Sequence, residues 1–315
     1  MNALAKALKD YLNLRTGLGF KLKDTRKALP KFVSFLRRRG ARFITTRLAV
    51  QWAAQPQTTH KGYWAQRLSM TRGFAKYLSG LDPRTEIPPA GILPYGNRRR
   101  KPHIYTRKEI QQLLRATRAR RRVHQIHAHT YATIFGLLSV TGLRLSEALN
   151  LDDADVDLNT SVLTIRGSKW RKSRLVPIHP TTTRKLARYR RQRNQLHPTR
   201  TTPAFFLLNN GARPRVLAVE RKYLRVARRM GLRGPPGTKG PYLHDLRHTF
   251  AVNTLLRWYR SGVDVECHLP ELATYLGHSH VAYTYWYLSA EPELLQLAAQ
   301  RLDSKKGDYC HEKPH

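Results

Sequence analysis

The sequence predicts a mainly α-helical protein with a small antiparallel β-sheet or hairpin, divided into two domains. Three observations support this prediction. Apolar residues recur at helical spacing through most of the 315 residues, two short strand-like runs lie close together near the middle, and a Pro/Gly-rich stretch at 83–96 separates two halves. With 41% hydrophobic residues, the chain is able to bury a core in each half.

The N-terminal half is predicted to be entirely helical. Apolar spacing predicts a helix near residues 3–12 and another near 29–36, and Gly40 ends the second one. Two more helices are expected at 46–54 and 63–78. This part of the chain is therefore expected to form a small basic helical bundle.

A basic linker follows. Arg98, Arg99, Arg100 and Lys101 come directly after the Pro/Gly-rich stretch, a composition that suits an exposed segment crossing a phosphate backbone. The pattern Thr106-Arg-Lys-Glu then predicts a capping box and the start of a new domain. We expect a first domain at residues 1–95, a linker at 96–105, a second domain at 106–302 and a C-terminal tail at 303–315.

The second domain is predicted to be helical around one β-hairpin. The expected elements are an apolar helix at 126–140, strands at 162–167 and 174–179, a helix at 180–196, a short strand or a turn into a helix at 205–210, and mostly helix from 216 to 301. The six residues SKWRKS join the two strands as the hairpin tip.

The charge of the chain indicates a polyanionic partner. Lys and Arg number 58 against 20 Asp and Glu, a formal net charge of +38. Both halves share the excess, because residues 1–100 hold 21 basic and 4 acidic residues. Nucleic acid is the usual partner of such a protein. A solvated basic surface and a ribosome-type RNA binder are the alternatives.

Other classes of protein are not indicated. The two cysteines, Cys267 and Cys310, form no CxxC pair, which fits a reducing cytosol and a cytoplasmic protein. The N-terminus lacks the apolar core of a signal peptide, and the longest apolar stretch, 131–143, is too short to span a bilayer, so no membrane partner is expected. The loop RGPPGTKGP at 233–241 lacks the order of a phosphate-binding loop, so no ATP chemistry is predicted.

The stretch TGLRLSEALNL at 141–151 is the first candidate for chemistry. Gly142 permits a tight turn, Arg144 lies at its edge, and Ser146 is a candidate cap for the helix that follows. Glu147, three residues after Arg144, is placed to hold the guanidinium, which then suits two-point binding of a phosphate. The plain alternative is a surface ion pair.

The hairpin tip is the second candidate. It carries Lys169, Arg171, Lys172 and Arg174, and a basic β-tip of this kind can enter a DNA groove. An ordinary charged turn explains the same residues.

Two further stretches carry histidines. In HDLRHTFA at 244–251, His244 and Arg247 share one side of a predicted helix start, although a core histidine is the commoner explanation of a lone His-x-x-Arg. In LGHSHVAYTYWY at 276–287, His278 precedes Tyr283, Tyr285 and Tyr287.

A metal site built from Cys267, His278 and His280 matches no common zinc spacing. No metal is therefore predicted.

Taken together and in this order, these stretches resemble the tyrosine recombinase, or phage integrase, family, which includes the Xer-type recombinases. The resemblance covers about residues 106–300: an arginine in a T-G-L-R-x-S-E turn, a lysine in a β-hairpin, His-x-x-Arg, L-G-H-S and a tyrosine. It implies two domains that form a C-shaped clamp on DNA, an all-helical core-binding (SAM-like) domain and a catalytic domain. The ending YWYLSAEPELL is also similar to integrases of transposon-type mobile elements.

The resemblance selects one tyrosine. In the family the nucleophile follows the L-G-H histidine by nine positions, which gives Tyr287 here. Helical geometry alone leaves two candidates, because Tyr283 and Tyr287 share a helix face. Tyr283 and Tyr285 are then packing or supporting residues.

The resemblance also implies a catalytic lysine. Counting backwards from R-L-V-P at 174–177 gives Lys169, with Lys172 as the alternative. Ser168 and Trp170 stand where Xer-type members carry glycines, so the turn is expected to bend differently.

The roles that the resemblance implies are those of strand exchange without ATP or metal. Arg144 and Arg247 clamp the phosphate, Lys169 protonates the leaving oxygen, His244 moves the proton of Tyr287, and His278 bonds a phosphate oxygen. The implied partners are a double-stranded DNA recombination site, further copies of the chain assembled on DNA as a tetramer, and other recombinases of the same element. The protein would act on the nucleoid. A type IB topoisomerase and a catalytically inactive DNA-binding regulator are the alternatives.

Overall fold

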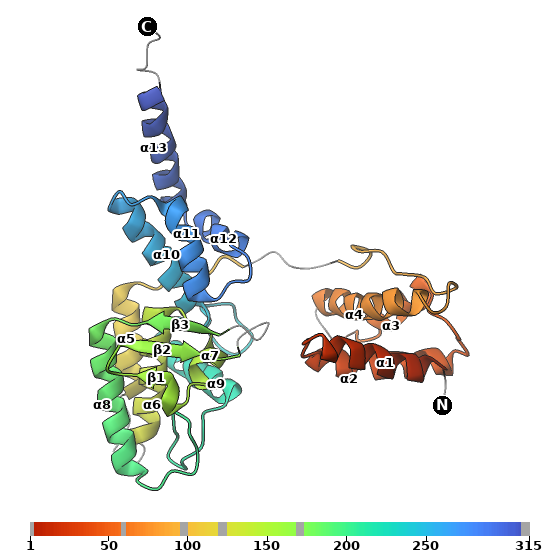
Figure 1. Ribbon diagram of the computed structural model, residues 1–315, viewed down its shortest axis with the longest axis horizontal. Coiled ribbons are helices and arrows are strands. Elements are labelled where there is room, and N and C mark those ends of the chain that lie inside the picture. The colour runs from red at the N-terminus through yellow and green to blue at the C-terminus, as the bar shows by residue number, and fades with distance from the viewer. Residues whose placement is uncertain (1–2, 58–60, 95–99, 119–124, 168–172, 310–315) are drawn as a thin grey trace. The chain divides into compact units, whose positions relative to one another are not determined.

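The computed structural model describes residues 3–57, 61–94, 100–118, 125–167 and 173–309 (Figure 1). These residues form helices and one three-stranded antiparallel sheet, so the prediction of a mainly α-helical protein with a small sheet is confirmed. The chain divides into two compact units, Met1–Arg100 and Lys101–His315. Five predicted site residues lie outside the described residues: Arg98, Arg99, Lys169, Arg171 and Lys172.

The first unit is a bundle of four helices. They are α1 (Ala3–Gly17), α2 (Lys23–Arg38), α3 (Thr46–Ala54) and α4 (Lys61–Ser79). Leu29, Phe32 and Leu36 recur at helical spacing on α2 and are fully buried, which explains why this strongly basic helix packs into the bundle. Gly40, with a φ of +65°, follows α2 as expected, and the Thr45 hydroxyl caps α3 by accepting from the Leu48 amide.

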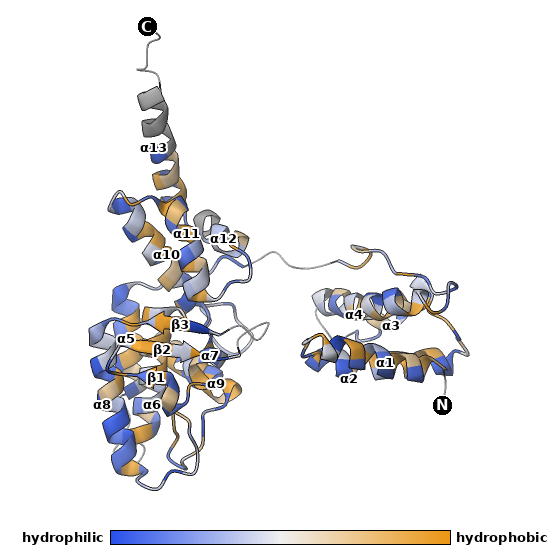
Figure 2. Cartoon of the chain, viewed as in Figure 1, coloured by the Kyte–Doolittle hydropathy of each residue, from blue (hydrophilic) through white to orange (hydrophobic). Residues whose placement is uncertain are grey.

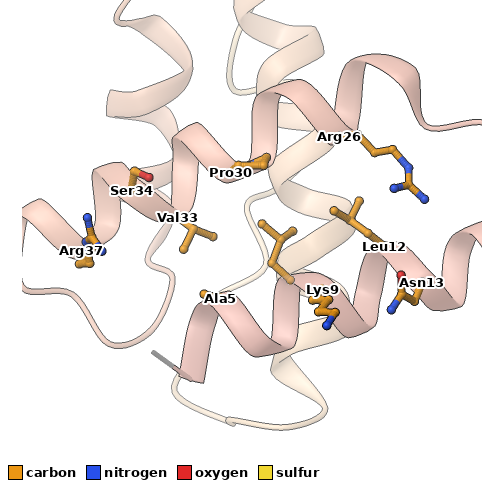
Figure 3. A pocket seen from close by; sticks show the side chains of 10 residues that line it. Ala5, Lys9, Leu12, Asn13, Arg26, Pro30, Val33, Ser34 and Arg37 are labelled. Carbon is orange, nitrogen blue, oxygen red and sulfur yellow. The ribbon is translucent and has the colours of Figure 1, made fainter. Parts of the chain in front are cut away.

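A groove of about 400 Å³ lies between α1 and α2 (Figure 3). Apolar side chains such as Leu12 and Val33 line it together with the long side chains of Lys9, Arg26 and Arg37. The groove therefore combines an apolar floor with cationic groups.

The second unit is built on nine helices and the sheet, with a short 3₁₀ turn (Asp153–Asp155) before the first strand, among the described residues. The elements are α5 (Arg107–Arg118), α6 (Gln125–Thr141), α7 (Leu145–Leu149), β1 (Val156–Asp157), β2 (Val162–Ile165), β3 (Arg174–Pro177), α8 (Pro180–Leu196), α9 (Val216–Arg229), α10 (Asp245–Arg260), α11 (Val265–Leu276), α12 (Ala282–Ala290) and α13 (Pro292–Tyr309).

The start of this unit has the predicted capping box. The Thr106 amide donates to the Glu109 carboxylate at 2.7 Å, and the Glu109 amide donates to the Thr106 hydroxyl at 3.1 Å. The apolar helix α6 then packs against α5, α7, α8 and α10, so it forms the centre of the unit. Since α7 follows α6 directly, this packing fixes the turn that carries Arg144.

The sheet has the strand order β1-β2-β3. Leu163 of β2 pairs with Val176 of β3 and both are fully buried, whereas Leu175, on the opposite face of β3, is 67% exposed. Ile165 pairs with Arg174 at the end of the hairpin that leads to the tip. In Figure 2 hydrophobic colour runs along the sheet, while hydrophilic colour marks the part of β3 nearest the tip.

The segment at 205–210, predicted as a short strand or a turn into a helix, forms no strand, apart from a single bridge between Asp152 and Ala204 just before it. It ends in a turn, in which the Gly211 amide donates to the Leu208 carbonyl at 2.9 Å, and the next helix begins at Val216. Phe205 and Phe206 are fully buried against the ring of Tyr189, so the apolar run serves the core rather than a sheet. No helix in the described part of the chain is long and apolar enough to cross a bilayer.

Candidate active site

The turn between α6 and α7 brings Arg247 into a fixed position. Gly142 has a φ of +61°, and a Cβ atom there would lie 2.6 Å from the Phe250 ring, so only glycine fits. Arg247 donates from Nη1 to the Gly142 carbonyl and from Nη2 to the Leu276 carbonyl, both at 2.8 Å. With 3% of its surface exposed, Arg247 ties α10 to both the turn and the end of α11.

Arg144 is held from two sides. Its Nη1 donates to Glu147 Oε1 at 2.7 Å, as the spacing predicted, and its Nη2 donates to the Gly277 carbonyl at 2.7 Å. The Arg144 amide also donates to Glu147 Oε2 at 3.0 Å. The prediction that Ser146 caps α7 is wrong, because Arg144 is the N-cap residue and Glu147 provides the bond to its amide.

Arg174 also lies within the site. Its Nη1 and Nη2 donate to Glu147 Oε1 and Oε2 at 3.1 and 2.9 Å, and its Nε donates to the Tyr275 carbonyl at 2.9 Å. Its side chain is 10% exposed. The structure therefore places Arg174 away from the exposed hairpin surface on which a DNA contact was expected, since each of its three nitrogens donates to Glu147 or to the end of α11.

The L-G-H turn closes over this network. Gly277 ends α11 with a φ of +71°, and a Cβ atom there would lie 2.6 Å from Nη1 of Arg174. Both its conformation and the close guanidinium require glycine at this position. The turn thus offers the Leu276 and Gly277 carbonyls to Arg247 and Arg144 respectively.

His278 follows this turn and faces α12. Its Nδ1 hydrogen-bonds the hydroxyl of Thr284, which is fully buried, at 2.9 Å. Burial and, after it, the positive charges of Arg247, Arg144 and Arg174 together lower the pKa of His278 to about 3. His278 is therefore neutral at physiological pH.

His244 is the residue immediately before α10, three positions from Arg247. Part of His244 is open to solvent, but desolvation in its crowded surroundings lowers its pKa, and Arg247 and Arg144 act in the same direction. The ring of His248, one helical turn later, lies edge-on to that of His244 with centroids 4.9 Å apart.

The three tyrosines of α12 have different surroundings. Tyr283 and Tyr285 are 46% and 48% exposed, whereas Tyr287 is 2% exposed. The ring of Tyr287 stacks on that of His278, with centroids 6.0 Å apart, and lies 5.5 Å from that of His248. Tyr287 is thus the tyrosine enclosed by the histidines of the site.

Arg247 and Tyr287 influence each other electrostatically. Burial lowers the pKa of Arg247 to about 10, while the charge and hydrogen bonding of Tyr287 oppose this shift. Arg247 remains a cation at neutral pH, so a positive charge is held beside the phenol.

The structure brings together those predicted catalytic and supporting residues that it describes. Arg144, Glu147, His244, Arg247, His278 and Tyr287 converge from α7, α10, α11 and α12 through the contacts described above. Arg100 and Lys101 are exposed, at the boundary of the two units. The prediction for Lys169 falls on a residue outside the described ranges.

Sequence reasoning missed two participants. Arg174 was assigned to the outer surface of the hairpin, and His248 was given no role. A signal for His248 was present, because it follows His244 by four residues and thus lies on the same helix face. Nothing in the local sequence around Arg174 identifies its partner Glu147, 27 residues earlier in the chain.

The arrangement suits a phosphate ester. Arg247, His248 and His278 lie around the phenol of Tyr287, and the Glu147 carboxylate is occupied in orienting Arg144 and Arg174 rather than repelling an anion. Among the residues that the structure describes, no three His, Cys, Asp or Glu side chains gather closely enough to hold a metal ion, and Cys267 is exposed.

Comparison with known proteins agrees with this geometry. The model of the phage integrase family matches residues 104–293. The y4rB protein of Sinorhizobium fredii, named as an integrase/recombinase, is 45% identical over 312 residues, which cover 98% of this chain and 99% of the relative.

Two solved structures have the same fold at low identity. A structure of the Tn1549 transposon integrase in complex with transposon right end DNA is 16% identical and matches with a TM-score of 0.64, covering 94% of this chain and 99% of that one. A lambda integrase tetramer bound to a Holliday junction is 15% identical and matches with a TM-score of 0.57, covering 88% and 77%.

Proposed function

The chain belongs to the phage integrase family and is a tyrosine-type site-specific recombinase, and from this premise we propose that Tyr287 is its nucleophile. The observation that carries the proposal is the position of Tyr287. Among the three tyrosines of α12, it is the one enclosed by His278 and His248 and electrostatically coupled to Arg247. The count of nine residues from His278 leads to the same residue.

Arg144 and Arg247 bind the scissile phosphate. Glu147 and the main-chain carbonyls hold both guanidinium groups, so they do not have to reorganise as negative charge develops in the transition state. A phenol has an ordinary pKa near 10, and the positive charge of Arg247 beside it favours the phenolate that attacks.

His244, Lys169 and His278 provide proton transfer and a further phosphate contact. His244 helps to remove the proton of Tyr287, and Lys169 protonates the departing 5′-oxygen as general acid. His278 is neutral, so one ring nitrogen accepts or donates to Thr284 while the other is available to bond a phosphate oxygen.

The reaction is an ester exchange. Tyr287 attacks the phosphorus, the 3′-phosphotyrosine bond forms as the bond to the 5′-oxygen breaks, and Lys169 supplies a proton to that oxygen. The ester bond is conserved, so a second strand carrying a 5′-hydroxyl reseals the DNA through a Holliday junction, without a role for ATP or metal.

Access to Tyr287 requires a structural change. Because Tyr287 is 2% exposed, a phosphate reaches its hydroxyl only if α12 shifts or the neighbouring side chains open. We expect the binding of DNA to bring about this change.

The proposed partner is a double-stranded DNA recombination site. The net charge of +38, spread over both units, supports binding dominated by phosphate contacts that weakens steeply with salt. We propose that both units contact the duplex. Arg98, Arg99, Arg100, Lys101, Arg171 and Lys172 are the proposed backbone contacts.

We further propose that copies of the chain assemble on DNA as a tetramer. The fold shared with the lambda integrase tetramer on a Holliday junction supports this. Leu294 and Arg301 of α13 pack against the chain's own α10 and the carbonyl of Val263, and the more distal part of α13 is the proposed contact with a neighbouring copy. Mobile-element DNA is the proposed context, with other recombinases of the element as further partners.

A duplex with a nick beside the cleavage point tests this function. The short fragment diffuses away after attack, so the covalent protein–DNA adduct accumulates. We expect an adduct on double-stranded DNA and joining of two duplexes through a Holliday junction. Relaxation of one duplex without any joining would indicate a topoisomerase instead, and preference for RNA in competition would indicate an RNA binder.

A further inference from the structure

Arg174 has a place in the site that the proposed chemistry does not use. It comes from β3, yet its three donor groups end on Glu147 and on the Tyr275 carbonyl of α11. Its guanidinium also lies against the Cα atom of Gly277, as the 2.6 Å approach of a Cβ atom built there indicates. The side chain is therefore held in one geometry and is not available to a distant phosphate.

Glu147 is shared between two arginines. Its Oε1 accepts from Arg144 at 2.7 Å and from Arg174 at 3.1 Å, and its Oε2 accepts from the Arg144 amide and from Arg174. The carboxylate is 6% exposed, so water screens these interactions little. Burial raises the pKa of Glu147, but Arg174 and, after it, Arg144 outweigh this effect and lower it.

The charge of this group decides what Arg144 offers a phosphate. Two guanidinium groups and one carboxylate carry a net charge of +1. If a neutral side chain replaced Arg174, Arg144 would be the one cation hydrogen-bonded to Glu147 among the described residues, and that pair would have no net charge. Such a pair attracts a dianionic transition state less than an arginine whose counter-ion is shared.

We propose that Arg174 is a positioning residue that, by sharing the Glu147 carboxylate, keeps Arg144 oriented and leaves its charge available to the scissile phosphate. The proposal rests on the function of Arg144 proposed above. Arg174 acts through Glu147 and touches neither the DNA nor the reacting atoms.

The first test compares Arg174→Met with Arg174→Lys on the nicked duplex at saturating DNA. Loss of a residue that orients a ligand typically costs about 10- to 100-fold in activity, and we expect adduct formation by Arg174→Met to slow by that amount. Arg174→Lys keeps the charge, so its rate of adduct formation should lie between that of Arg174→Met and that of wild type. Duplex affinity stays at the wild-type value, and an unchanged adduct rate for both variants would overturn the proposal.

A matched control separates the loss of a buried ion pair from the loss of this particular one. Arg193 makes a similar two-point contact with Asp153, at 2.9 and 3.0 Å, and is fully buried in the same unit. Arg193→Met should lower the thermal unfolding temperature but leave the adduct rate per folded molecule at the wild-type value. If Arg193→Met lost as much adduct rate as Arg174→Met, both losses would be explained by impaired folding, and the proposal would be contradicted.

The charge argument is tested by adding Glu147→Gln. In the Arg174→Met background, this change removes the carboxylate that neutralises Arg144, so the double variant should form adduct at least as fast as Arg174→Met alone. It also remains informative if Arg174→Met folds poorly, because no carboxylate is left with one partner. A further loss of adduct rate in the double variant would contradict charge sharing.

A substrate with a 5′-bridging sulfur distinguishes orientation of Arg144 from placement of the hairpin lysine, which are two ways in which Arg174 could affect cleavage. A thiolate leaves without protonation, so it does not need the lysine, and Arg174→Met should form adduct slowly on this substrate as well. Rescue would mean that Arg174 acts by placing the hairpin lysine, which contradicts the proposal. If wild type itself forms no adduct, the proposed function fails rather than this inference.

Discussion

The ring of Tyr287 stacks on the ring of His278, with centroids 6.0 Å apart and planes 21° apart. Each residue is held in place by other elements: His278 bonds Thr284, and Tyr287 lies edge-on to His248 of α10. The stack joins the L-G-H turn to the helix that carries the proposed nucleophile. The protonation state of His278 therefore affects both the stability of the site and its chemistry.

The burial of His278 in its neutral form predicts that acid destabilises the protein. The pKa of His278 is about 3 in the folded chain against an ordinary value of 6.5. Between these values the unfolded chain binds the extra proton, so stability is full above about pH 7 and is lost as the pH falls. From pH 7 to pH 5 we expect a loss of about 1 kcal/mol from this residue, after allowance for its partial exposure.

Urea unfolding across this pH range measures the loss. His278→Gln should flatten the dependence on pH. His280→Gln, at an exposed position two residues away, is the matched control. An equal slope for wild type and His278→Gln would show that the histidine is not buried in its neutral form.

Replacing the clamp arginines by lysine should separate binding from cleavage. Lysine keeps the charge of Arg144 but loses the fork that joins Glu147 to the Gly277 carbonyl. Loss of one oriented transition-state contact typically costs about 3–4 kcal/mol, or roughly 100- to 1,000-fold in rate. Adduct formation should fall by this factor in Arg144→Lys, while duplex affinity changes little.

Arg247→Lys should add a loss of stability to the same catalytic defect. Arg247 joins two main-chain carbonyls inside the protein, and a lysine ammonium cannot reach both in that geometry. Thermal unfolding is therefore expected at a lower temperature for Arg247→Lys than for Arg144→Lys. Near-normal cleavage by both variants would remove the arginines from the active site.

The general acid is tested by the leaving group. Lys169→Ala should block attack on an ordinary phosphodiester, whereas a 5′-bridging sulfur should restore cleavage because a thiolate needs no proton. Gel analysis of the adduct on the two substrates gives the result. If the sulfur substrate restored cleavage by Lys172→Ala but not by Lys169→Ala, Lys172 rather than Lys169 would be the general acid.

Gly277 offers a sharp test of the turn. Gly277→Ala combines a left-handed backbone, which costs about 1–2 kcal/mol for an L-residue, with a Cβ atom 2.6 Å from Arg174. Gly262→Ala has an almost identical φ of +73° but no atom within 4 Å, so it carries the backbone cost alone. We expect both to lower stability, and only Gly277→Ala to slow cleavage strongly. Equal cleavage rates would show that the fit between Gly277 and Arg174 does not matter to the site.

Local sequence patterns were sufficient to predict much of the fold. The helix predicted at 46–54 and the one at 180–196 have those bounds in the structure, because each has a clear start signal and regular apolar spacing. The run at 205–210 was ambiguous, because periodicity alone does not distinguish a short apolar strand from an irregular segment buried in the core. Its core partner Tyr189 also lies well before it in the sequence.

The site was predictable residue by residue but not contact by contact. The pair Arg144–Glu147 follows from a spacing of three, whereas the bonds of Arg247 to Gly142 and of Arg174 to Glu147 join segments far apart in the chain. Periodicity could not choose between Tyr283 and Tyr287 either. Their difference in exposure, 46% against 2%, arises from the packing of α12 on α10 and α11.

The most direct measurement is the identity of the tyrosine that becomes attached to DNA. Wild type, Tyr287→Phe, Tyr283→Phe and Tyr285→Phe are incubated with the nicked duplex, and the adduct is digested and located by mass spectrometry. Tyr287→Phe keeps the ring against His278 and loses the hydroxyl alone, so it should bind DNA like wild type and form no adduct, while the other two variants form it. An adduct that persists in Tyr287→Phe, or a peptide modified at Tyr283, would contradict the account.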